Sequence, residues 1–151
     1  MTEIHERDDR CHKFLKQSHS NLLRDLENQT EGIRKRILAY CGKSCLYPQI
    51  IDFFQELCHE NEGIDQLISL LNQRYQEEVF IKVSDSIIHV TYSKCYCQFF
   101  QLNLIPSSVI CECSCNCLKE FFEKILEKRI NVQIIQSIAR GAQMCEFLVS
   151  I

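Results

Sequence analysis

The spacing of apolar residues changes its period near residue 77, and this change constrains the fold more than any other feature of the chain. Before it, apolar residues recur every three or four positions, as at Leu67 and Leu71, which is the period of an amphipathic helix. After it, Ile88, Val90 and Tyr92 alternate with other residues, which is the period of a strand. The sequence therefore predicts helices first and a sheet second.

Four helices are predicted before the change of period. Thr30 is a suitable N-cap for the second helix, Ile33 and Ile37 are expected to face the core, and Gly42 is expected to end the helix. Ser44 is expected to cap the third. The predicted spans are about 8–27, 30–41, 44–58 and 64–71.

The second half of the chain is predicted to contain two strands, one helix and two further strands, in the order ββ–α–ββ. A hairpin is predicted around Asp85-Ser86, followed by an amphipathic helix at about 115–128 and a strand pair at 132–137 and 145–151. We therefore predict an α+β fold in which N-terminal helices precede an antiparallel sheet unit. The prediction is a single domain, 1–151, with a helical part at about 1–76 and a cysteine-rich α+β part at about 77–151.

Composition excludes several classes of partner. The net charge is only −3, and basic residues are interspersed with acidic ones, so we expect no nucleic-acid surface. No apolar run approaches the roughly 20 residues that cross a bilayer, so we expect no membrane segment. The first ten residues are polar and charged, without the apolar region of a secretion signal, which favours a cytoplasmic location.

Cysteine is the residue that points to a site. The chain has 11 cysteines in 151 residues, and six of them fall in Cys95-Tyr-Cys97 and in the alternating run from Cys111 to Cys117. In a reducing cytoplasm these thiols stay free, and clustered free thiols indicate metal binding or reactive chemistry rather than disulfides.

Several motifs carry a resemblance to a known family. They are Cys41-Gly-Lys-Ser-Cys45, Cys95-Tyr-Cys97, Cys111-Glu-Cys113-Ser114 and Ser137-Ile-Ala-Arg-Gly141-Ala-Gln-Met-Cys145-Glu-Phe147. Together they resemble the 4-vinyl reductase type of domain and the L-2-amino-thiazoline-4-carboxylic acid hydrolases, most closely over residues 87–151. The resemblance implies a ligand-binding α+β fold that is shared with nitric-oxide-sensing haem domains and with subunits of a Golgi transport tether. It also implies a small-molecule ligand and a homodimer.

In the sensor versions of that fold, a carboxylate and cysteines of the C-terminal hairpin hold zinc. Cys145 matches the last of those ligands, but Ser137 stands where the sensors have another cysteine, and Gln133 and Ile134 supply no carboxylate. Cysteines from 95–97 and 111–117 would have to complete the set. Haem is not expected, because the histidine that those haem domains use has no counterpart.

The predicted metal ligands are therefore Cys95, Cys97, Cys111, Cys113 and Cys145. Thiolates select zinc, copper(I) or iron–sulfur clusters, and zinc is preferred here over an iron–sulfur cluster. Sulfurs that share a zinc ion lie under about 4 Å apart, whereas alternate side chains of an extended chain stand about 6.6 Å apart. Two C-x-C segments would have to meet. Reactive thiols without metal, or thiols that only fill space, remain alternatives.

Cys113 has a second possible role as a nucleophile. With Ser114 as N-cap, Cys113 would lie at a helix N-terminus, where the thiol pKa falls. His89 is the candidate base, although a solvent-facing strand histidine is the simpler interpretation. A hydrolase acting on a thiazoline carboxylate would use Cys113, with Arg140 as carboxylate anchor and Phe99 lining the pocket; Arg140 could equally be an exposed turn residue and Phe99 core. A third possibility is an assembly subunit without chemistry.

Overall fold

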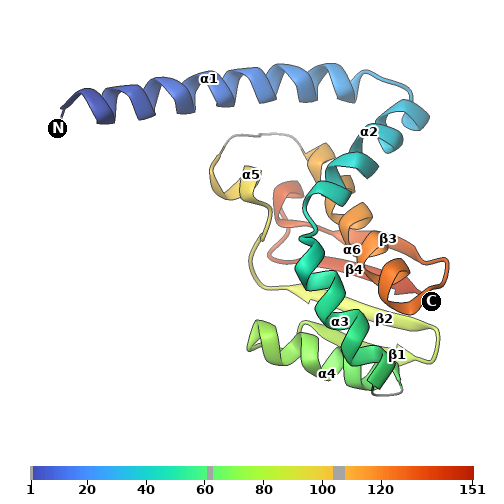
Figure 1. The fold of residues 1–151 in the computed structure, drawn as a ribbon. Helices are drawn as coiled ribbons and strands as arrows, with labels where there is room; N and C mark the ends of the chain where they lie inside the picture. Colours follow the sequence, from blue (N-terminus) through green and yellow to red (C-terminus); the bar gives the residue numbers. More distant parts are fainter. Residues whose placement is uncertain (1, 61–62, 104–107) are drawn as a thin grey trace.

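The computed structural model describes residues 2–60, 63–103 and 108–151, and Figure 1 shows their arrangement. Four helices come first, followed by a four-stranded antiparallel sheet with one long helix between its hairpins, so the α+β prediction is confirmed. The helices are α1 (Thr2–Glu27), α2 (Glu31–Ser44), α3 (Pro48–Glu60), α4 (Ile64–Tyr75), the single turn α5 (Gln98–Gln101) and α6 (Cys111–Leu126). The strands are β1 (Phe80–Ser84), β2 (Ile87–Tyr92), β3 (Asn131–Gln136) and β4 (Cys145–Ser150), with 3-10 turns η1 (Ser108–Ile110) and η2 (Ile138–Arg140).

The strand order is β1-β2-β4-β3, so the strand that is last in the chain lies inside the sheet. Phe147 of β4 pairs with Val90 of β2 on one side and with Ile134 of β3 on the other. Helices α3, α4 and α6 pack on one face (Figure 1), where Phe54 of α3 meets Phe121 of α6 edge to face with ring centroids 5.6 Å apart. This face holds the main core.

The other face of the sheet carries the alternate residues of each strand. Leu148 and His89, which pair across β4 and β2, are half-buried. Ile81 of β1 is 40% exposed. His89 therefore faces away from α6, on the side opposite to the core residues Ile88 and Val90.

The prediction that Gly42 ends the second helix is wrong, because α2 continues through Gly42 to Ser44. The third helix begins at Pro48 rather than after Ser44, and proline suits the first helical position. Gly42 is inside α2 because the helix backbone meets α6 there: a Cβ at Gly42 would lie 2.7 Å from the Cβ of Asn116.

The start of the long helix in the second half was also predicted wrongly. Helix α6 begins at Cys111 with Ile110 as N-cap, so Ser114 is inside the helix and does not cap it. The alternating cysteines are consequently helical. Residues two apart in a helix differ by about 200° in direction, so Cys111 and Cys115 project from one side of α6, and Cys113 and Cys117 from the other.

Helix α1 runs past the body of the molecule and joins it at its C-terminal turns (Figure 1). Leu23 and Leu26 are buried in a second core cluster with Leu38 of α2 and Ile110, whereas residues 10–17 are exposed. In the described ranges, no helix combines the length and the apolar character that crossing a membrane requires.

Candidate functional site

The cysteines around α6 form two sets, one on each side of this helix. The sheet-side thiols are Cys95, Cys97, Cys111 and Cys145. The α2-side thiols are Cys41, Cys45, Cys113 and Cys117. The members of each set interact electrostatically with one another, and all eight are free thiols. Of the five predicted metal ligands, the structure thus brings four together and places Cys113 in the other set.

Hydrogen bonds anchor the sheet-side thiols to the turn after β3. The Cys111 thiol donates to the hydroxyl oxygen of Ser137 over 3.3 Å, and Ser137 is fully buried. The backbone N–H of Ile138 donates to the sulfur of Cys145 over 3.4 Å. The segment with Cys95 is held by the Gln101 side chain, which donates to the Cys95 carbonyl over 2.8 Å.

The Cys95 and Cys111 thiols stay protonated at neutral pH. The pKa of Cys95 is raised to about 11, mainly by burial and to a smaller extent by the neighbouring thiols Cys145, Cys97 and Cys111. Burial also raises the pKa of Cys111, although the Ser137 hydrogen bond and the Arg140 guanidinium oppose the increase. Arg140 therefore lies close enough to act on these thiols, while its own side chain is exposed.

The sheet-side thiols do not form a metal site as they stand. Among the side chains that the structure describes, no three histidines, cysteines or carboxylates are arranged to hold a metal ion. Zinc therefore stays a prediction, and its ligands could not include Cys113 without a large rearrangement, because that residue projects from the opposite side of α6.

On the α2 side, the thiols of Cys45 and Cys113 influence each other's ionisation. Cys45 is exposed and follows the last residue of α2, whereas Cys113 is 6% exposed in the first turn of α6. Interaction with the Cys113 thiol lowers the pKa of Cys45 to about 6 against the effect of burial. The same interaction, together with burial, raises the pKa of Cys113.

The expectation that the helix N-terminus lowers the pKa of Cys113 is therefore wrong. The thiolate is favoured instead on Cys45, which the sequence analysis did not single out as a reactive residue. His89, the predicted base, lies on the opposite face of the sheet from α6, so the structure does not pair it with Cys113. The role of Cys113 as a nucleophile stays a prediction.

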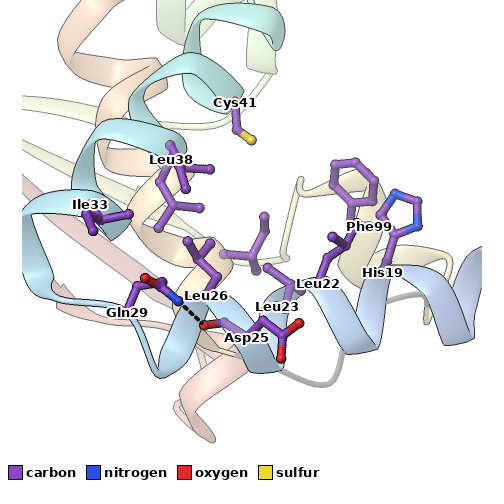
Figure 2. Close-up of a pocket in the computed structure, with 12 residues that line it drawn as sticks. His19, Leu22, Leu23, Asp25, Leu26, Gln29, Ile33, Leu38, Cys41 and Phe99 are labelled. Carbon is purple, nitrogen blue, oxygen red and sulfur yellow. Dashed lines mark hydrogen bonds between the residues drawn. The ribbon is translucent and has the colours of Figure 1, made fainter.

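A pocket of about 540 Å³ lies between α1, α2, α5 and η1 (Figure 2). Its lining is almost entirely apolar and includes Phe99, which the sequence analysis proposed as a pocket residue. Phe99 lies beside the ring of His19, with ring centroids 5.3 Å apart. The remaining lining residues are Leu22, Leu23, Asp25, Leu26, Gln29, Ile33, Ile37, Leu38, Cys41 and Ile110.

Sequence reasoning missed most of this pocket because it assigned the apolar stripe of the second helix to the core. Ile33 and Ile37 are 37% and 43% exposed, and both line the pocket. The sequence did contain a signal for the pocket. In each of the first two helices, the apolar side has more residues than the few that the structure buries, which are Leu23, Leu26 and Leu38.

Comparison with known proteins leaves the function open. No curated protein matches the chain at a significant level. One family model matches residues 2–151, and its description is a family of unknown function, DUF6144. Because the match covers nearly the whole chain, this protein belongs to the DUF6144 family.

Proposed function

We propose that this protein binds a small, flat, largely apolar molecule in the pocket between α1, α2 and α5. The observation that carries the proposal is the pocket itself: about 540 Å³ of space with an almost wholly apolar lining. Ligand pockets in proteins are typically about 300–1,000 Å³ and are lined mainly by hydrophobic and aromatic side chains. The volume suits a molecule of one or two fused rings.

The arrangement of rings supports a flat ligand. Phe99 and His19 come from two different elements and stand side by side at one end of the pocket (Figure 2). The His19 ring is held in place because its Nδ1 hydrogen-bonds the Leu15 carbonyl over 2.8 Å. Two positioned rings favour planar molecules, since aromatic groups attract one another in stacked and edge-to-face geometries.

The test uses 1-anilinonaphthalene-8-sulfonate, an aromatic dye that carries one sulfonate and fluoresces when it enters an apolar site. We expect saturable binding of about one dye per chain to the folded protein. Ile37→Asn places an amide in the pocket wall and should weaken binding at least about fivefold, because burying an unpaired amide costs about 1–3 kcal/mol and about 1.4 kcal/mol is a factor of ten. Ile135→Asn is the matched control, since Ile135 is 48% exposed on β3 and is not part of the lining.

The same experiment separates a ligand pocket from a subunit interface. Light scattering after size-exclusion chromatography gives the oligomeric state of each variant. Dye binding that Ile37→Asn leaves unchanged would overturn the proposal. So would a dimer that binds no dye and becomes monomeric in Ile37→Asn, because a second copy would then cover these side chains. Dimerisation elsewhere on the surface stays a prediction of the resemblance.

A second candidate is zinc binding by Cys95, Cys97, Cys111 and Cys145. It is favoured by the electrostatic coupling of these thiols: the charges of Cys145, Cys97 and Cys111 raise the pKa of Cys95, and a bound cation would relieve that repulsion. The described side chains are not in ligand positions, so the segment that carries Cys95 and Cys97 would have to move towards α6.

A further inference from the structure

We propose that the sheet face turned away from α3, α4 and α6 is the contact surface of a homodimer, in which a second copy of this chain packs sheet against sheet. We call this surface the open face. Its apolar members, read from the alternation and register of the strands, are Ile81, Val83, Ile87, Leu148 and Ile135. The open face is separate from the pocket between α1, α2 and α5.

The open face lacks the packing that covers the other side of the sheet. Among the described residues, none of its five apolar side chains belongs to either core cluster. Ile81, Val83 and Ile135 are 40%, 63% and 48% exposed. A sheet with one face in solvent commonly carries polar residues on that face, and contiguous exposed apolar residues mark interaction surfaces. The apolar side chains here therefore point to a partner that covers them.

An acidic and a basic residue lie at the centre of the open face. His89 of β2 pairs with Leu148 of β4, and Thr91 pairs with Glu146, so His89 and Glu146 are diagonal neighbours on the two inner strands. Such neighbours stand about 7–8 Å apart. Both are half-buried, and neither has an ion-pair partner among the described residues. The other polar residues of the face are uncharged: Thr91, Asn131, Gln133 and Ser150.

This arrangement is self-complementary, which selects a second copy of the chain as the occupant. Consider a two-fold axis that runs between two facing sheets and passes midway between His89 and Glu146. It sets each His89 opposite the Glu146 of the other copy, so a ring N–H can donate to a carboxylate at two places. Leu148 is next to both residues, so it falls close to the axis and meets its own copy.

An isologous interface makes every contact twice in this way. A partner of another sequence would need an acidic and a basic group at the same spacing, amid apolar side chains, whereas a second copy already has them. The face is neither strongly acidic nor strongly basic, so two copies do not repel each other.

The size of the open face sets the expected strength of the dimer. Four strands of five or six residues form a surface of roughly 15 by 20 Å, because strands lie about 4.8 Å apart and rise about 3.3 Å per residue. This is smaller than the standard interface of about 800 Å² per partner. We therefore expect a dimer that forms at micromolar concentrations and dissociates on dilution.

The test is sedimentation equilibrium of the wild type and its variants from low to high micromolar concentration. His89→Glu sets two carboxylates against each other at both places and should raise the dissociation constant at least about tenfold. Combining His89→Glu with Glu146→His exchanges the two groups, so it should largely restore dimerisation. His12→Glu, at an exposed position of α1, is the matched control and should change nothing.

Two isoleucine variants separate this dimer from the ligand pocket. Ile135→Asn places a polar amide on the open face, so it should weaken the dimer and leave dye binding unchanged. Ile37→Asn, which alters the pocket lining, should weaken dye binding and leave the dimer unchanged. The dimer and the pocket can therefore fail independently.

Isoleucine methyl NMR spectra of the wild type give a reading that depends on no variant. Between low and high concentration, the methyl signals of Ile81, Ile87 and Ile135 should shift, and those of Ile33 and Ile37 should not. A wild type that stays monomeric, or shifts confined to other isoleucines, would overturn the proposal. So would an exchange variant that is folded by circular dichroism but no more dimeric than the single histidine variant.

Discussion

Gly42 and Asn116 bring two helix backbones into direct contact: a Cβ added to Gly42 would lie 2.7 Å from the Asn116 Cβ and 2.9 Å from its carbonyl carbon. Real side chains essentially never approach so closely, so the position excludes every residue larger than glycine unless a helix shifts. The separation of α2 and α6 at this point therefore depends on the absence of a Cβ at position 42.

The first prediction concerns that methyl group. Gly42→Ala should lower the free energy of unfolding by about 1–3 kcal/mol, because an added carbon in a tightly packed contact forces the backbones apart. Gly32→Ala in the same helix has nothing within 4 Å of the new Cβ and should be neutral or stabilising by up to about 1 kcal/mol. Urea denaturation measures both. Equal effects at the two positions would show that the contact has no energetic weight.

The second prediction concerns the buried hydroxyl of Ser137. Ser137→Ala removes the acceptor of the Cys111 thiol and should cost about 1 kcal/mol of unfolding free energy, the usual net value of a hydrogen bond. Ser44→Ala is the control, because Ser44 is exposed and donates only to the Tyr40 carbonyl of its own helix; its change should stay within about 0.5 kcal/mol. If Cys111→Ala is made first, Ser137→Ala should cost less.

The third prediction is a loss of stability at alkaline pH. Burial raises the pKa of Cys115 and Cys117 to about 12, whereas a thiol in an unfolded chain ionises near about 8.5. From about pH 8.5 upwards the unfolded state has lost protons that the native state still binds, so the free energy of unfolding falls as pH rises. Cys45, with its lowered pKa, is already ionised in the native state; it opposes this decline near about pH 8.5, where its unfolded thiol still ionises, and adds almost no slope above about pH 9.5.

Urea denaturation at several pH values between about 8 and 10.5, with a phosphine reductant present, measures this slope. Cys117→Ala should make the decline shallower. Cys11→Ala, at an exposed position of α1, should leave it unchanged. A free energy of unfolding that stays constant over this range would contradict the raised pKa values.

The fourth prediction tests zinc. If the sheet-side thiols bind metal, protein purified without oxygen should contain close to one zinc or iron per chain. Cys95→Ser should abolish it and Cys113→Ser should not, because Cys113 projects from the other side of α6. A structural thiolate site contributes on the order of 10 kcal/mol to folding, so chelation should also lower the melting temperature. Metal-free protein with unchanged melting would eliminate this candidate.

The sheet was the part of the fold that the sequence predicted well. Buried strands show alternation directly, and Cys145, Phe147 and Val149 of β4 are all buried as expected. The edge strand β1 was harder to read, because its apolar residues Ile81 and Val83 are 40% and 63% exposed on the face away from the helices. Alternation predicts that a strand exists, but not which of its faces the core covers.

The thiol site was only partly predictable. Cysteines at 111, 113, 115 and 117 have the period of a strand, yet they lie in a helix that is packed on two sides: Cys111 hydrogen-bonds Ser137, and Cys113 is buried on the side of α2. Residues two apart in this helix point in nearly opposite directions, and both directions are buried, so the cysteines alternate in sequence as they would in a strand. The prediction that Gly42 ends the second helix failed for a related reason. Glycine ends many helices, and only the position of α6 shows that here it permits a close approach.

The place of β4 in the sheet has a consequence for synthesis of the protein. Among the described strands, β4 comes last in the sequence, yet it pairs with both β2 and β3. On the ribosome, the first hairpin and β3 are complete before their shared neighbour has emerged, and each presents an unpaired edge with apolar side chains. Such edges are prone to aggregation. Emergence of residues 145–150 is thus the event that closes the sheet, and a nascent chain that stalls before them is the form most in need of a chaperone.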